Sequence, residues 1–160
     1  MEDKKEPIKV ILADDDKDDQ QVFEEAINET AIPVDLTTAD NGQELMDNLH
    51  DPSIPNPDII FLDMNMPLKN GKECLEEIKN DEDLKDIPCI MYTTSTSDKD
   101  IEETYKAGAH LYVPKPTLFS SIVKILKKIL RLNWKEFIKK PIKSFVVSEQ
   151  NIVKNKDQNN

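Results

Sequence analysis

Glycine and cysteine are both scarce in this 160-residue sequence, which contains three glycines and two cysteines. The glycines, Gly42, Gly71 and Gly108, lie far apart, whereas a typical nucleotide- or flavin-binding protein needs a glycine-rich loop around its phosphates. Cys74 and Cys89 lie in apolar segments and lack the spacing of a metal or redox motif, so we expect two reduced thiols in the core. The sequence therefore argues against these classes of binding site.

Basic charge and long apolar runs are also lacking. The chain has 21 Lys and Arg residues against 32 Asp and Glu residues, a net charge of −11, whereas a nucleic-acid-binding protein would show a basic face. No apolar run approaches the roughly 20 residues of a membrane span, and the charged residues 1–7 do not resemble a signal peptide. We expect a cytoplasmic protein that binds neither nucleic acid nor membrane.

The acidic charge is concentrated in the first part of the chain. Residues 1–132 carry 15 basic and 29 acidic side chains, a net of −14, whereas residues 133–160 carry 6 and 3, a net of +3. A chain of this length is suited to one domain with a sizeable core. We predict an acidic domain over residues 1–132 and a mildly basic C-terminal extension over residues 133–160.

Short apolar runs alternate with segments of helical periodicity along the acidic domain. The runs predict strands at residues 8–13, 34–39, 58–62, 88–92 and 111–113, each followed by a helix, with Thr117 expected to cap the last one. The run that ends at Leu62 is apolar throughout, which is typical of a strand buried on both faces. Five strands alternating with five helices predict a doubly wound parallel α/β domain.

Polar side chains follow four of the predicted strands. Asp14 and Asp15 end the first strand, Asp63 the third, Thr93 the fourth and Lys115 the fifth, and in a doubly wound sheet such positions converge on one crevice. Three carboxylates there would repel one another unless a cation intervened, and hard oxygen ligands suit magnesium. A lysine and a hydroxyl beside the metal suit a phosphoryl group, with the central carboxylate as nucleophile.

This constellation resembles the receiver domain of two-component response regulators over about residues 8–131. The resemblance is carried by the aspartate pair after the first strand, Leu-Asp-Met-Asn-Met-Pro around Asp63 with Gly71 eight residues on, Thr93, and Lys115-Pro116. It implies a flavodoxin-like receiver fold with strand order 2-1-3-4-5. It further implies a phosphoacceptor signalling protein that catalyses only its own phosphorylation and dephosphorylation.

The resemblance also assigns roles to the metal-site residues. Asp63 would accept phosphate from a sensor histidine kinase. Asp15 and Asp63 would bind magnesium directly, Asp14 would hold a metal-bound water, and the backbone carbonyl of Asn65 would complete the protein ligands.

The remaining roles belong to the fourth and fifth strands. Lys115 would pair with the phosphoryl group, and its peptide bond to Pro116 would be cis. Thr93 and Tyr112 occupy the switch positions of the family, although a packing role for Tyr112 is an alternative.

Two alternatives to a signalling protein that acts through a protein contact stay open: a phosphorelay intermediate and an aspartate-nucleophile phosphatase. We expect no effector domain after the last helix, so the protein would signal through a phosphorylation-dependent protein contact or relay phosphate to a histidine phosphotransfer protein. Asp14-x-Asp16 after a strand also resembles aspartate-nucleophile phosphatases of the haloacid dehalogenase type. The motif of those enzymes has Thr or Val four residues after the first aspartate, where this chain has Asp18.

The extension resembles that of single-domain regulators paired with phytochrome-type and related hybrid kinases. Trp134, Phe137 and Ile138 continue a helical spacing beyond the last helix, and further apolar residues extend to Val147. Left uncovered, they would form an unusual apolar patch. The extension either folds back on its own domain or joins the last helix in a homodimer, which we predict, and we expect order to about residue 147 and disorder beyond it.

Overall fold

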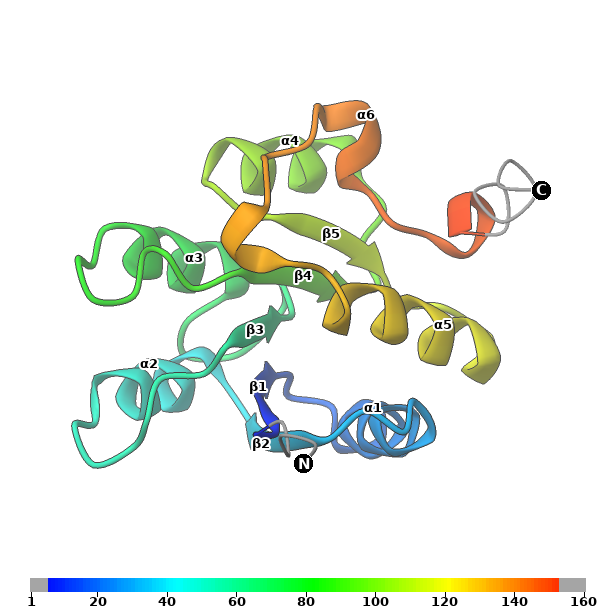
Figure 1. Cartoon of the computed structure of the whole chain (residues 1–160). Helices are drawn as coiled ribbons and strands as arrows, with labels where there is room; N and C mark the ends of the chain where they lie inside the picture. The colour runs from blue at the N-terminus through cyan, green and yellow to red at the C-terminus, as the bar shows by residue number, and fades with distance from the viewer. Residues whose placement is uncertain (1–5, 153–160) are drawn as a thin grey trace.

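The computed structural model describes residues 6–152 and has a parallel sheet between two helical layers (Figure 1). The strands are β1 (Ile8–Ala13), β2 (Val34–Ala39), β3 (Ile59–Leu62), β4 (Cys89–Thr93) and β5 (Leu111–Pro114). They form one sheet in the order β2-β1-β3-β4-β5, and every pairing is parallel. All residues of β3 are buried, as its apolar run predicts. The predicted fold class and strand order are confirmed.

The helices cover both faces of the sheet, as Figure 1 shows. They are α1 (Lys17–Glu29), α2 (Gly42–His50), α3 (Gly71–Lys79), α4 (Asp98–Lys106) and α5 (Phe119–Leu130). One apolar cluster joins α1 and α5 to the sheet, and a second joins α2, α3 and residues of α4. None of the helices within residues 6–152 is long and apolar enough to cross a membrane.

The start of α5 differs from the prediction. Thr117 is not its cap; the N-cap residue is Leu118, whose side chain makes no capping hydrogen bond. Instead, Glu149 from the extension accepts hydrogen bonds from the backbone N–H groups of Thr117 and Leu118, each at 2.9 Å. A remote carboxylate thus satisfies two backbone donors immediately before the first turn of this helix, where negative charge is favourable.

The predicted helical continuation of α5 is wrong. The helix ends at Leu130, and the extension continues as a 3-10 turn, η1 (Trp134–Glu136), and a short helix, α6 (Ile142–Phe145). The indole Nε1 of Trp134 donates to the carbonyl oxygen of Ile129 at 3.2 Å. This carbonyl also accepts from the N–H of Leu132 at 3.2 Å, so the indole adds a further bond at the end of α5, where the chain turns back onto the domain.

The extension crosses the free edge of the sheet beside β5. Val146 forms a parallel bridge with Tyr112, and the N–H of Val147 donates to the Tyr112 carbonyl oxygen at 2.8 Å. Phe145 joins the apolar cluster on the α4 face and Val147 the one on the α5 face, as the two-residue alternation of a strand requires. Much of the apolar surface of the extension is therefore covered by its own chain.

Two parts of the extension remain outside this cover. Ile138 and Ile142 are exposed. Order continues past residue 147, because the Nδ2 of Asn151 donates to the carbonyl oxygen of Val146 at 2.6 Å. The rest of the segment expected to be disordered, residues 153–160, lies outside the described residues.

Candidate functional site

The predicted site residues meet at the carboxyl edge of the sheet. The N–H of Asp63 donates to the carbonyl oxygen of Ala13 and the N–H of Asp14 to that of Ala39, both at 3.0 Å. These bonds continue the strand ladders one residue past β1 and β3, which fixes both aspartates at the same edge. This is the crevice where open α/β sheets place their ligands.

Three carboxylates converge in this crevice. One oxygen from each of Asp14, Asp15 and Asp63 lies within 4.8 Å of the other two. Asp14 and Asp63 are buried, and Asp15 is exposed. Burial raises the pKa of Asp14 to about 6, although hydrogen bonds to its carboxylate from Lys115 and Asp16 oppose the rise. Proximity and burial both disfavour three negative charges here in the absence of a cation.

Lys115 supplies a fixed positive charge at the centre of the cluster. Its Nζ lies 2.7 Å from Oδ2 of Asp14, 3.1 Å from Oδ2 of Asp63 and 2.8 Å from Oδ2 of Asp19. Burial alone would lower the pKa of Lys115, but the surrounding carboxylates outweigh it and raise that pKa. The lysine is therefore a permanent cation held within reach of Asp63.

Asp19 belongs to this cluster although no sequence motif marks it. It lies in the first turn of α1, where Asp16 is the N-cap residue and accepts from the N–H groups of Asp18 and Asp19. Because α1 begins at the crevice, its first turn can point a carboxylate at Lys115. The order of the elements could therefore have predicted that Asp19 lies near the crevice, whereas the amphipathic spacing of α1 could not.

The loop after β3 is shaped by a close backbone approach. The N–H of Gly71 donates to the carbonyl oxygen of Met64 at 3.0 Å. A Cβ atom at residue 71 would lie 2.2 Å from the carbonyl oxygen of Asp63, so this position requires glycine. The N–H of Asn65 lies 3.4 Å from Oδ1 of Asp63. The loop thus holds Asn65 beside the central carboxylate.

The two predicted switch residues are connected through Ser95. The N–H of Ser95 lies 3.4 Å from Oγ1 of Thr93, and the hydroxyl of Tyr112 donates to the Ser95 carbonyl oxygen at 2.9 Å. Thr93 and Tyr112 are both fully buried. A hydrogen-bonded path therefore runs from Thr93 at the end of β4, through Ser95, to the Tyr112 side chain on β5.

One expectation from the resemblance is wrong. Residues 6–152 contain no cis peptide bond, so the bond between Lys115 and Pro116 is trans. The trans form is preferred intrinsically at X–Pro bonds by about 0.5–1 kcal/mol. The N–H of Lys115 still donates to the carbonyl oxygen of Thr93 at 2.7 Å, which continues the β4–β5 ladder to the crevice.

The donor set fits a hard divalent cation. The three clustered carboxylates offer only oxygen atoms, the ligands preferred by magnesium and similar ions. Bound charge at this point would favour the ionised form of Asp14, whose pKa is otherwise raised. The crevice can therefore hold a metal beside a lysine and a central aspartate.

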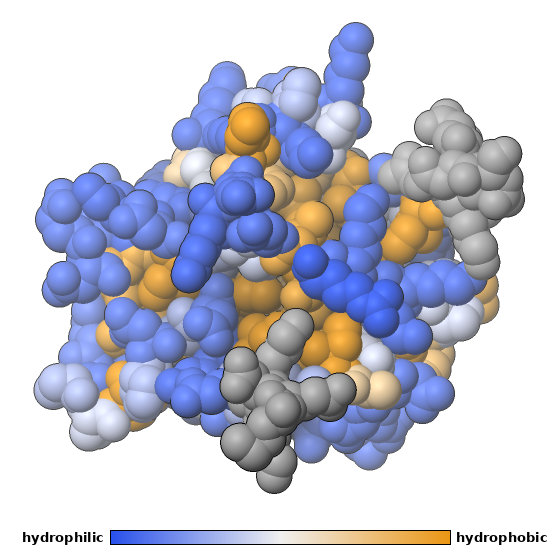
Figure 2. Space-filling model, in the orientation of Figure 1, coloured by the Kyte–Doolittle hydropathy of each residue, from blue (hydrophilic) through white to orange (hydrophobic). Residues whose placement is uncertain are grey.

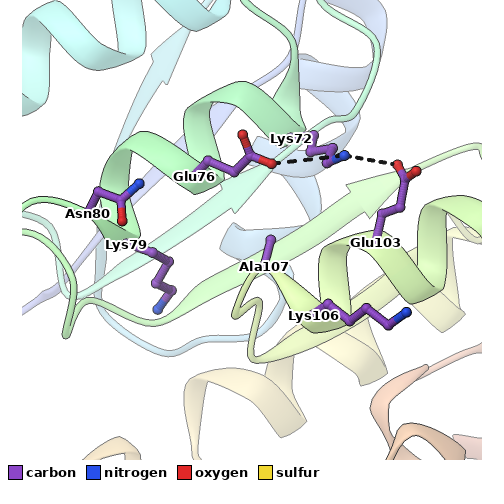
Figure 3. A pocket seen from close by; sticks show the side chains of 7 residues that line it. All are labelled: Lys72, Glu76, Lys79, Asn80, Glu103, Lys106 and Ala107. Carbon is purple, nitrogen blue, oxygen red and sulfur yellow. Dashed lines mark ion pairs between the residues drawn. The ribbon is translucent and has the colours of Figure 1, made fainter.

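A second concavity lies between α3 and α4 (Figure 3). Its volume is about 420 Å³, and its charged side chains largely offset one another. Lys72 lies 3.3 Å from Glu103 and 3.9 Å from Glu76, the two ion pairs drawn in Figure 3. Lys79 and Lys106 mark the C-terminal ends of the two helices, which lie at the opposite edge of a parallel sheet. This pocket is separate from the acidic crevice.

Fold and crevice together define a class of protein. A doubly wound sheet in the order 2-1-3-4-5, with an acidic cluster and a half-buried lysine at its carboxyl edge, is the architecture of a phosphoacceptor signalling domain. The family model of the response regulator receiver domain matches residues 10–127. The chain belongs to this family, and it is a two-component signalling protein rather than a conventional enzyme.

Two individual members of this family show which response regulators the chain is similar to. The chain is 33% identical to response regulator Rcp1 of Synechocystis sp. over 134 residues, which cover 81% of this chain and 91% of Rcp1. A crystal structure of the phosphorylated cyanobacterial phytochrome response regulator RcpA matches with a TM-score of 0.73 at 33% identity, covering 81% of this chain and 95% of RcpA.

The chain is also similar in structure to a crystal structure of Rcp1 in its Mn(2+)-bound form. It matches with a TM-score of 0.72 at 30% identity and covers 84% of this chain and 99% of Rcp1. The chain is thus similar to single-domain regulators, including phytochrome response regulators.

Proposed function

We propose that this protein is a single-domain response regulator that accepts a phosphoryl group on Asp63 from a sensor histidine kinase. The observation that carries the proposal is the position of Asp63, which directly follows the central strand, β3, and lies beside Asp14, Asp15 and Lys115. In the transfer, the P–N bond of the phosphohistidine breaks and a P–O bond to a carboxylate oxygen of Asp63 forms. The step is a group transfer without any redox change.

The same crevice supports a magnesium-dependent reaction. We assign Asp15 and Asp63 as direct ligands, Asp14 as holder of a metal-bound water and the Asn65 backbone carbonyl as a further ligand. A bound magnesium ion would neutralise phosphoryl charge. Lys115, already 3.1 Å from Asp63, would contribute a second positive charge to the phosphoryl oxygens.

The path from Thr93 to Tyr112 suits a switch. We assign Thr93 as the residue whose hydroxyl follows the phosphoryl group and Tyr112 as the residue that reports it on β5. Ser95 bonds to both side chains, so movement at Thr93 reaches Tyr112 through one residue. Phosphorylation would bias two existing arrangements rather than create a new fold.

The output of this protein is proposed to be a phosphorylation-dependent protein contact in the cytoplasm. Its kinase would be phytochrome-like or a related hybrid, as the relatedness to RcpA suggests. The second candidate is a relay that passes phosphate to a histidine phosphotransfer protein, which a chase of labelled regulator with such a protein would reveal. The phosphatase alternative is disfavoured, because the family match covers residues 10–127 and because Asp63, not Asp14, follows the central strand, β3.

Magnesium should stabilise the folded protein. Millimolar magnesium is expected to raise the thermal midpoint by several degrees, because it binds the folded state and relieves repulsion between Asp14, Asp15 and Asp63. Asp15→Ala should remove most of this gain while leaving the metal-free midpoint nearly unchanged, since Asp15 is exposed. Differential scanning calorimetry with and without magnesium measures both. Equal midpoints for the wild-type protein in the two buffers would contradict the metal site.

We also propose a homodimer through α5 and the extension. Ile138 and Ile142, which its own chain leaves exposed, are available to a second copy. Light scattering at high micromolar concentration should give the mass of a dimer, and truncation after Leu132 should give that of a monomer. A monomer mass for the full-length protein, with and without phosphorylation, would reject the dimer and leave the extension as an intramolecular cover.

A further inference from the structure

The extension and α5 enclose a groove that neither would form alone. Its volume is about 370 Å³, and its apolar wall combines residues of β5, the end of α5 and the extension: Leu111, Ile129, Leu132, Phe137, Val146 and Val147. In Figure 2, apolar surface is visible in this region between α5 and the extension, with hydrophilic side chains reaching across it. The groove is distinct from the acidic crevice, since the two share no residue.

Three lysines surround this apolar wall. Lys128, Lys140 and Lys143 all line the groove, and all three are exposed. Within residues 6–152, none of the three forms an ion pair with a carboxylate. They form a basic rim on a protein whose first 132 residues carry a net charge of −14. The groove therefore combines apolar surface with uncompensated positive charge.

We propose that this groove binds a peptide segment of a partner protein that carries both carboxylates and apolar side chains. The inference rests on the proposed function, in which the output is a protein contact, and it specifies the surface and the chemistry of the partner. Apolar side chains of the segment would fill the groove, and its carboxylates would meet the lysines at the rim. Complementary charge contributes specificity and association rate, and buried apolar anchors contribute affinity.

A peptide fits this surface better than an anionic membrane. The apolar residues that line the groove are buried or half-buried, and the three lysines are exposed, whereas membrane-bound surfaces insert apolar side chains that project outward.

The groove is connected to the proposed switch. The N–H of Val147 donates to the carbonyl oxygen of Tyr112, and Val146 forms its bridge with the same residue. Two wall residues of the groove are thus fixed to the backbone of β5, next to Leu111. A change at Tyr112 would move this wall, so phosphorylation and peptide binding would influence each other with equal coupling free energy.

A peptide library tests the proposal on the full-length protein. The probe is a pool of 12-residue peptides, each containing four Glu and four apolar residues in random order, compared with a pool in which Gln replaces Glu. The wild-type protein should enrich the Glu pool at least tenfold over the Gln pool in low salt. The variant Lys128→Glu/Lys140→Glu/Lys143→Glu should lose this preference, because charge complementarity becomes repulsion.

Two matched controls isolate the groove. Lys99→Glu/Lys106→Glu/Lys124→Glu makes the same change in net charge at exposed residues outside the groove, and it should retain the enrichment. Ser144→Trp, which adds bulk at a groove residue, should reduce binding at least tenfold, whereas Ser120→Trp on the exposed start of α5 should not. Equal loss in both lysine variants, or no enrichment by the wild-type protein, would overturn the proposal.

The outcome is separable from that of the proposed function. Each protein is also labelled with acetyl phosphate, and the groove variants should label like the wild-type protein, since their lysines lie outside the crevice. Normal labelling without peptide enrichment rejects the groove alone. Peptide enrichment without labelling rejects phosphoacceptance alone. Binding to phosphatidylserine vesicles without peptide enrichment assigns the basic rim to lipid and also rejects the proposal.

Discussion

Asp63→Asn protein incubated with acetyl phosphate and magnesium should carry no acyl phosphate above background, whereas the wild-type chain should gain one base-labile phosphoryl group. The substitution is nearly isosteric, but an amide group lacks the anionic oxygen that attacks phosphorus. This loss is the largest effect on activity that we expect for this chain. Intact-mass spectrometry before and after mild base measures both the gain and its lability.

The fold should survive this change. Lys115 keeps Asp14 at 2.7 Å and Asp19 at 2.8 Å as partners when the carboxylate at residue 63 is lost. The matched control is Asp35→Asn, which alters an exposed carboxylate on β2 away from the crevice and should label like the wild-type protein. Equal labelling of the Asp63→Asn and wild-type proteins would show that phosphate is accepted elsewhere.

Much of the fold is predictable because the strands of a buried parallel sheet have short, continuous apolar sequences. β3 is apolar throughout and buried throughout, and its end at Leu62 places the next residue, Asp63, at the carboxyl edge. The same logic places Asp14 and Lys115, since each follows or ends a run that must lie in the sheet. Strand boundaries shift by about one residue because backbone pairing, rather than hydrophobicity, decides them: Thr93 is paired within β4.

Contacts between distant segments are the part that periodicity could not predict. Asp19 meets Lys115 across 96 residues of sequence, and Glu149 meets Thr117 across 32. Asp19 lies on an amphipathic helix and Glu149 in a polar terminal segment, and both sequence patterns are equally compatible with a carboxylate that faces solvent. The predicted helical continuation of α5 into the extension is wrong for the same reason. Trp134 matches a helical repeat, but its side chain bonds to the end of α5 and turns the chain.

The largest expected effect on stability is at Phe145. This side chain is fully buried, and its ring centroid lies 5.0 Å from that of Tyr105 and 6.0 Å from that of Tyr112. Phe145→Ala should weaken docking of the extension by about 3–5 kcal/mol, the usual cost of deleting a buried phenyl ring. Because the extension follows the sheet and α5, it can open without unfolding them. The loss should therefore appear first as local opening.

Hydrogen exchange at the Val147 N–H measures this opening, because that group donates to the carbonyl oxygen of Tyr112 when the extension is docked. Its protection should fall about 100-fold or more in Phe145→Ala, since each 1.4 kcal/mol is a factor of ten. Ile138→Ala removes an apolar side chain of the same extension that is 82% exposed and should leave protection nearly unchanged. Equal protection in the two variants would mean that Phe145 does not hold the extension. Phosphorylation of Asp63 should persist in Phe145→Ala, because the crevice is built from strand ends that the extension does not form.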